Sequence, residues 1–169
     1  MDKRFLLALI ILLATSMLSA ARKALVIGNA SYQDKPLLNT VNDAQDIKNK
    51  LEALGFMVRP VYNANFEQMG RAIQEFTNTL DSVDEAVFYY AGHGVQLDGE
   101  NYLLPVSPRI TDKISVQYNS IKCNEIIERM ERPRVAIIFL DACRDNPFSW
   151  ARSLSRGLVS IGRVFPNQC

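Results

Sequence analysis

The apolar positions of this chain fall into two patterns, continuous runs and residues spaced three or four apart. The continuous runs predict strands and cover 23–29, 56–62, 85–92 and 134–143. The wider spacing predicts amphipathic helices and covers about 40–54, 65–80 and 121–130. Pro60 lies in the second run, and because proline donates no ladder hydrogen bond, this strand is expected at a sheet edge. Strands alternating with helices indicate an α/β fold with a mostly parallel sheet and helices on both faces.

Capping residues refine the ends of the first two helices. Thr40 or Asn42 is available as the N-cap of the first helix, and Gly55 as its terminator. The apolar positions of that helix are Ala44, Ile47, Leu51 and Leu54. The second helix opens at Asn65 with Gln68 three residues later, which is the pattern of a capping box. The side chains that it is expected to bury are Met69, Ala72, Ile73, Phe76 and Leu80.

The first 21 residues have the layout of a secretory signal peptide. Two basic residues precede an apolar run over about 5–18, and small residues follow it. The run is shorter than the roughly 20 residues that a membrane-spanning helix needs, so no stable membrane anchor is expected. Cleavage after Ala21 would leave residues 22–169 as one domain, exported to the periplasm or the extracellular space.

Charge and spacing exclude several classes of partner. The chain has 19 basic and 18 acidic residues, and removal of residues 1–21 leaves it formally neutral. There is therefore no basic excess for nucleic acid or anionic lipid. The sequence has neither a C-x-x-C nor an H-x-x-x-H spacing, and "VIGNASY" lacks the three glycines of a dinucleotide fingerprint. We therefore predict no metal site and no cofactor.

Two residues with reactive side chains follow the third and fourth predicted strands. His93 lies in "YYAGHG" and Cys143 lies in "FLDACRDNPF". If these strands are neighbours, both residues lie at the same rim, where the carboxyl ends of parallel strands gather catalytic groups. His93 is the only histidine, and Gly92 and Gly94 should leave its imidazole unscreened by large side chains. Cys143 can be read as a nucleophile, as half of a disulfide or as a small apolar residue at a strand end.

Six landmarks in order carry a resemblance to a known family. They are "ALVIGNASY", the "ND" of Asn42 and Asp43, "LGF", "YYAGHG", "NYLLP" and "LDACRDNPF", and they span about 22–157. They resemble the caspase-like cysteine peptidases, the bacterial metacaspase-like branch above all, in which histidine precedes cysteine by about 50 residues. The resemblance implies a three-layer caspase-like fold. Family domains continue with two further strands, so we expect this chain to lack the last strands.

The resemblance also implies a role for each residue of a catalytic dyad. Cys143 would be the nucleophile, and His93 would lower its pKa and act as general acid. The backbone amides of Cys143 and Gly94 would stabilise the oxyanion of the tetrahedral intermediate. No acidic third partner for His93 is evident in the sequence.

Two aspartates would set the specificity. In the metacaspase-like branch, Asp141 and Asp43 would form an acidic pocket that selects Arg or Lys before the scissile bond. Asp141 has an alternative role in a salt bridge to Arg144, and Asp43 has one in supporting the first turn of its helix. Some metacaspases bind calcium through clustered aspartates, but no such cluster can be placed here.

The remaining features leave alternatives open. Cys123 and Cys169 are each a buried small residue or half of a disulfide, and an odd cysteine count leaves at least one thiol unpaired within the chain. The run 135–140 is apolar at every position, so it should be covered on both faces and paired on both edges. A homodimer or a small-subunit-like partner would complete the sheet. The second functional hypothesis is a truncated, catalytically silent caspase-fold protein that binds partners.

Overall fold

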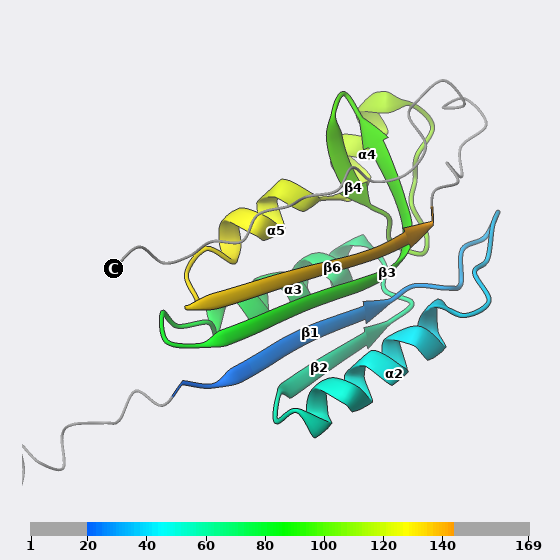
Figure 1. Ribbon diagram of the computed structural model, residues 1–169. Helices are drawn as coiled ribbons and strands as arrows, with labels where there is room; N and C mark the ends of the chain where they lie inside the picture. Colours follow the sequence, from blue (N-terminus) through cyan, green and yellow to red (C-terminus); the bar gives the residue numbers. More distant parts are fainter. Residues whose placement is uncertain (1–19, 144–169) are drawn as a thin grey trace, which may run out of the picture.

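The computed structural model describes residues 20–143 of the chain (Figure 1). Its elements follow one another as β1 (Arg22–Gly28), α2 (Thr40–Ala53), β2 (Met57–Tyr62), α3 (Phe66–Asn78), β3 (Glu85–Leu97), β4 (Glu100–Leu103), α4 (Lys113–Asn119), β5 (Ile121–Lys122), α5 (Cys123–Arg129) and β6 (Val135–Cys143). Nearly all of the predicted signal segment, together with Arg144 and Cys169, lies outside the described residues. Within that described range, no helix is long and apolar enough to cross a membrane.

Four strands build the parallel part of the sheet in the order β2, β1, β3, β6. Beyond His93, β3 leaves this part and pairs antiparallel with β4, which in turn pairs with β5. Among the described strands, β2 pairs only with β1, so the edge position predicted from Pro60 is confirmed. The mostly parallel sheet predicted from the alternation of strands and helices is confirmed as well.

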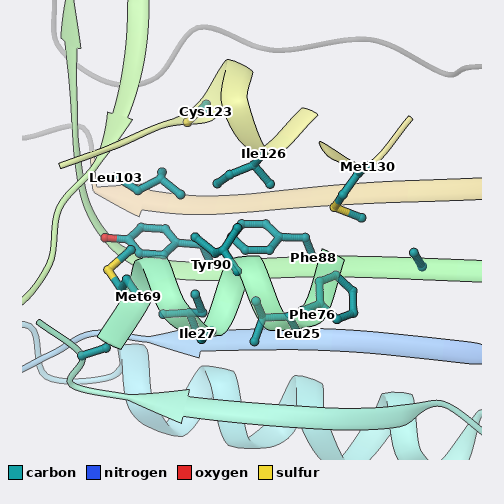
Figure 2. Packing of buried hydrophobic residues seen from close by; sticks show 14 of the residues in the cluster. Leu25, Ile27, Met69, Phe76, Phe88, Tyr90, Leu103, Cys123, Ile126 and Met130 are labelled. Carbon is teal, nitrogen blue, oxygen red and sulfur yellow. The ribbon is translucent and has the colours of Figure 1, made fainter. Parts of the chain in front are cut away.

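Helices cover both faces of the parallel strands. α2 lies on one face, where Ala44, Ile47 and Leu51 pack against β-strand residues such as Val26 and Tyr89. α3 and α5 lie on the other face and enclose the main core (Figure 2). All five side chains predicted to be buried by the second helix are buried in that region. The three-layer α/β architecture is therefore the one expected from the sequence.

The helix ends match the prediction only in part. α3 has the predicted capping box between Asn65 and Gln68, and Gly55 follows α2 with a φ of 83°, as a helix terminator should. The predicted N-cap of α2 is wrong. The capping position is Asn39, and the Thr40 hydroxyl instead donates to the carbonyl of Asn29 at 2.8 Å. Leu54, predicted on the buried face, is 61% exposed because it follows the last turn.

A hairpin and a short helix were missed by the sequence analysis. β3 continues to Leu97, and β4 returns after a turn at Asp98 and Gly99, both with positive φ. An Asp-Gly pair is a strong hairpin signal, because both residues tolerate the left-handed turn conformation. α4 also lies in a segment with no predicted element. A helix was expected over 121–130, but the first two residues of that range form β5 and the helix α5 begins after them.

β6 buries one face only within the described part of the chain. Ala136, Ile138, Leu140 and Ala142 pack against the main core. Val135, Ile137 and Phe139 point to the opposite face and are 39%, 42% and 52% exposed. Among the described strands, β6 pairs with β3 alone. The expected cover on both faces and both edges is therefore absent from residues 20–143.

Candidate active site

The two residues of the predicted dyad lie opposite each other on the paired strands β3 and β6. The strands are parallel neighbours, and the Cα atoms of His93 and Cys143 are register partners. Neighbouring strands lie about 4.8 Å apart, so both residues occupy the same rim of the sheet. This is the placement that the sequence predicted on the condition that the two strands are adjacent.

The ring of His93 is held by a backbone carbonyl. Its Nε2 atom lies 2.7 Å from the carbonyl oxygen of Lys35, in the loop that follows β1. A carbonyl oxygen only accepts hydrogen bonds, so Nε2 carries a hydrogen and the neutral ring is the Nε2–H tautomer. Sequence analysis found no acidic third partner for this histidine. A backbone partner has no side-chain signature in the sequence.

The backbone of His93 is tied to two tyrosines. Its N–H donates to the hydroxyl of Tyr32 at 3.0 Å, and its carbonyl accepts from the hydroxyl of Tyr90 at 2.7 Å. The N–H of Leu104, just beyond β4, donates to the same carbonyl at 3.0 Å. The loop after β1, the residue after β4 and a neighbour within β3 itself therefore fix the position of His93.

Gly92 permits this arrangement. A Cβ atom at position 92 would lie 2.4 Å from the Tyr90 hydroxyl oxygen and 2.7 Å from that of Tyr32. Any side chain here would displace the hydroxyls that hold His93. The expectation that flanking glycines leave the imidazole unscreened is wrong, because His93 is only 2% exposed and its ring packs on Tyr32.

The predicted oxyanion donors lie at the same rim. Gly94 and Leu103 are register partners in the antiparallel ladder of β3 and β4. The bond from Leu104 N–H to the His93 carbonyl makes those two residues the hydrogen-bonded pair. Pairs alternate along an antiparallel ladder, so Gly94 belongs to a non-hydrogen-bonded pair and its N–H is not used by β4.

The two predicted specificity aspartates gather around Tyr89. The Tyr89 hydroxyl donates to Oδ2 of Asp141 at 3.4 Å. Burial, the charges of Asp141 and Asp43, and the hydrogen bond to Asp141 raise the pKa of Tyr89 to about 12. Both carboxylates are exposed. Asp43 also lies in the first turn of α2, so its alternative role is compatible with this position. The alternative partner of Asp141, Arg144, lies outside the described residues.

A pocket opens beside His93, and neither of these aspartates lines it. It has a volume of about 290 Å³ and is formed by the loop after β1 and the segment after β4. Tyr32 and His93 contribute to its lining, as do the basic residues Lys35 and Arg109. The sequence analysis did not find this pocket, because its walls come from two loops that are 70 residues apart in the chain.

Cys123 is free and buried. Burial and the nearby charge of Glu100 raise its thiol pKa to about 12. The disulfide alternative is therefore wrong for this cysteine, and its interpretation as a small buried residue is confirmed. Among the residues placed by the structure, no group of three or more His, Cys, Asp or Glu side chains could hold a metal ion.

Comparison with known proteins identifies the family. A family model described as the caspase domain matches residues 21–159. Over 134 residues the chain is 30% identical to the human mucosa-associated lymphoid tissue lymphoma translocation protein 1, and over 134 residues it is 31% identical to the mouse homologue. It is 30% identical to mouse caspase-1 over 129 residues. The chain belongs to the caspase family of cysteine peptidases.

The shared region is a small part of these relatives. It covers 75% of this chain and 15% of the human and mouse lymphoma translocation proteins. For mouse caspase-1 the shares are 73% and 31%. The matches define the family of the domain, and membership of the metacaspase-like branch stays a prediction.

Proposed function

We propose that the chain is a cysteine endopeptidase in which His93 and Cys143 form the catalytic dyad. The observation that carries the proposal is their register pairing at the carboxyl ends of β3 and β6. The bond from Nε2 to the Lys35 carbonyl adds to it, because it assigns the proton-exchanging role to Nδ1. A histidine with one nitrogen fixed and the other able to titrate is suited to general acid–base chemistry.

The proposed reaction proceeds in two steps. The Cys143 thiolate attacks the substrate carbonyl carbon, and the C–N bond breaks as Nδ1 of protonated His93 gives its proton to the leaving amine. Water then attacks the thioester carbonyl carbon and passes a proton to His93. The C–S bond breaks, which releases the acid product and restores the Cys143 thiolate. The amides of Gly94 and Cys143 are proposed to stabilise the oxyanion in both steps, and the unused N–H of Gly94 in the β3–β4 ladder supports this role.

The proposed substrates are proteins or peptides with Arg or Lys before the scissile bond. Asp141 and Asp43 support this specificity, because their charges converge near Tyr89 at the same end of the sheet. A carboxylate pair attracts a guanidinium by charge-assisted hydrogen bonds and repels an aspartate. The test uses two fluorogenic peptides that differ only in Arg or Asp before the cleavable bond. Cleavage of the arginyl peptide alone supports the proposal, and equal cleavage of both contradicts it.

A matched pair of variants locates the specificity. Asp141→Asn should lower kcat/KM for the arginyl peptide by roughly tenfold or more, the effect of losing one charged hydrogen bond. Asp46→Asn, on the same helix as Asp43 but not among the charges that act on Tyr89, should leave kcat/KM unchanged. An unchanged preference in Asp141→Asn would show that another group binds the basic side chain.

The alternative function is that of a catalytically silent protein that binds partners. The observation that favours this alternative is the exposure of apolar side chains on β6. Val135, Ile137 and Phe139 present an apolar strip that a second copy or a small-subunit-like partner would cover. An activity-based thiol probe separates the two functions. Selective labelling of Cys143 at neutral pH supports the enzyme, and ordinary thiol reactivity supports the silent scaffold.

We also propose that the chain is exported and that its mature form begins at Arg22. β1 begins at the same residue, so the mature chain would keep every described element. N-terminal sequencing of protein purified from the producing cell tests this, and a chain that retains residues 1–21 would contradict it. The proposed reaction uses protein groups only, and a comparison of activity in calcium and in a chelator tests whether the chain also needs calcium.

A further inference from the structure

Tyr32 contacts His93 at two points. Its ring centroid lies 4.3 Å from that of the imidazole, with an angle of 55° between the two planes. Its hydroxyl accepts a hydrogen bond from the His93 backbone N–H at 3.0 Å. Both residues are buried. One side chain therefore contacts both the backbone and the ring of the histidine.

The same loop supplies the carbonyl that holds Nε2. Tyr32 and Lys35 both lie between β1 and α2, and the N–H groups of Tyr32 and Leu37 donate to the carbonyl of Ala30 at 2.9 Å each. Oδ1 of Asn63 accepts from the N–H of Ala30 at 2.9 Å and so ties the loop to the end of β2. Because these bonds brace the loop, the Tyr32 ring and the Lys35 carbonyl act on the imidazole as one unit.

The Tyr32 hydroxyl is itself held by two further groups. It donates to the carbonyl of Leu104 at 3.0 Å and lies 3.2 Å from the hydroxyl of Tyr90. Burial raises the pKa of Tyr90 well above its usual value, so Tyr90 stays protonated and donates to the His93 carbonyl. The Tyr90 hydroxyl also lies 2.9 Å from the Leu104 carbonyl. Each hydroxyl has one hydrogen to donate, and with Tyr32 donating to Leu104, the shorter contact of Tyr90 is the one to His93.

We infer that Tyr32 is a positioning residue that holds the His93 imidazole with Nε2–H on the Lys35 carbonyl and Nδ1 exchanging the catalytic proton. Tyr32 itself exchanges no proton in this scheme. It acts by limiting the orientations of the ring, and small errors in the orientation of a catalytic group lower the rate strongly. The inference rests on the catalytic role proposed for His93.

The first test does not depend on peptidase activity. His93 is the only histidine of the chain, so protein without a histidine tag gives one pair of imidazole ¹⁵N signals. In the wild-type chain we expect the neutral ring to be the Nε2–H tautomer alone. Tyr32→Leu should give a mixture of tautomers and a shifted imidazole pKa, and Tyr32→Phe, which keeps the ring, a smaller shift.

The matched control is Tyr102→Phe. Tyr102 is buried in the same apolar cluster as Tyr32 and Leu104, and its register partner in β3 is Val95, two residues beyond His93. This variant loses one tyrosine hydroxyl and should leave the ¹⁵N signals of His93 unchanged. If Tyr32→Leu does not fold, the signals of the wild-type chain and of Tyr32→Phe remain decisive.

The second test is kinetic. Tyr32→Phe should lower kcat for an arginyl peptide about tenfold with KM unchanged, because the loss concerns the orientation of the histidine rather than substrate binding. The pH at which kcat is half-maximal should shift in the same direction as the imidazole pKa. Tyr102→Phe should retain the wild-type kcat and pH profile.

The outcomes separate this inference from the proposed function. Wild-type tautomer, imidazole pKa and kcat in Tyr32→Phe and Tyr32→Leu would overturn the positioning role, even in an active peptidase. An inactive wild-type chain whose ¹⁵N signals still respond to Tyr32→Leu would support the positioning role and contradict the peptidase proposal. A wild-type ring in the Nδ1–H tautomer would overturn the inference directly.

Discussion

The carbonyl oxygen of Lys35 lies 2.7 Å from Nε2 of His93. The acceptor belongs to the backbone, so no particular side chain at position 35 is needed to hold the imidazole. It makes the neutral ring the Nε2–H tautomer, and β3 places that ring at the end of the parallel ladder beside β6. In the dyad that we propose, this backbone carbonyl from the loop after β1 would take the place of the acidic third residue of many hydrolytic triads.

Selective alkylation should distinguish Cys143 from Cys123. The pKa of Cys123 is raised to about 12 by burial and Glu100, so near neutral pH it has on the order of 10³ times less thiolate than an ordinary cysteine. We expect iodoacetamide to modify Cys143 first, as seen by mass mapping of peptides. His93→Ala should slow the modification of Cys143 and leave that of Cys123 unchanged. Faster modification of Cys123 would contradict the assignment.

The titration of Tyr89 should report the two aspartates. Asp141→Asn and Asp43→Asn should each lower the Tyr89 pKa from about 12 towards its usual value, because each removes a nearby negative charge. Asp141→Asn should have the larger effect, since it also changes the hydrogen bond. ¹³C signals of labelled tyrosine measure the shift, with Asp46→Asn as the control. An unchanged titration in both variants would show that the aspartates do not converge on Tyr89.

Two glycines should respond to alanine in opposite directions. Gly92→Ala places a Cβ atom 2.4 Å from the Tyr90 hydroxyl, and overpacking of this kind costs about 1–3 kcal/mol of the free energy of unfolding. Gly70, in α3, has no atom within 4 Å of an added Cβ, so Gly70→Ala should stabilise the fold by about 0.5–1 kcal/mol. Urea unfolding measures both. A neutral Gly92→Ala would mean that the tyrosines do not pack as described.

Self-association should depend on the exposed face of β6. Val135, Ile137 and Phe139 form an apolar strip on that strand, and such surfaces recruit other chains. We expect light scattering to show a dimer or larger assembly at high concentration, and Phe139→Ser to reduce it. Tyr118→Ser removes an exposed aromatic side chain from α4 and should have no such effect. A wild-type monomer at high concentration would contradict this expectation.

The sequence predicted the four parallel strands from local patterns, and it predicted that His93 and Cys143 meet on the condition that their strands are neighbours. Apolar runs locate strands, and parallel neighbours bring their carboxyl ends to one rim. It did not predict which side of β6 is exposed, since a run that is apolar at every position has no alternation to reveal its two faces. The apolar run that predicted the third strand ends before "GHG", whereas β3 continues to Leu97 and forms a hairpin with β4, which Leu104 follows.

The partners of His93 were invisible for a different reason. The Lys35 carbonyl and the Tyr32 hydroxyl reach the histidine from about 60 residues away in the sequence. Tyr32 lies in a loop with no periodic pattern, and only the folded chain brings it against Tyr90. The requirement for Gly92 likewise arises from these two hydroxyls.

We propose that His93 and Cys143 act as a unit in peptide hydrolysis. The most direct test of this proposal measures kcat/KM on an arginyl peptide for the wild-type chain, Cys143→Ala, His93→Ala and the double variant. We predict low but measurable activity in the wild-type chain alone, loss of cleavage in each single variant, and no further loss in the double variant, because residues that work together are not additive. Substantial cleavage by Cys143→Ala, or losses that add in the double variant, would contradict the account.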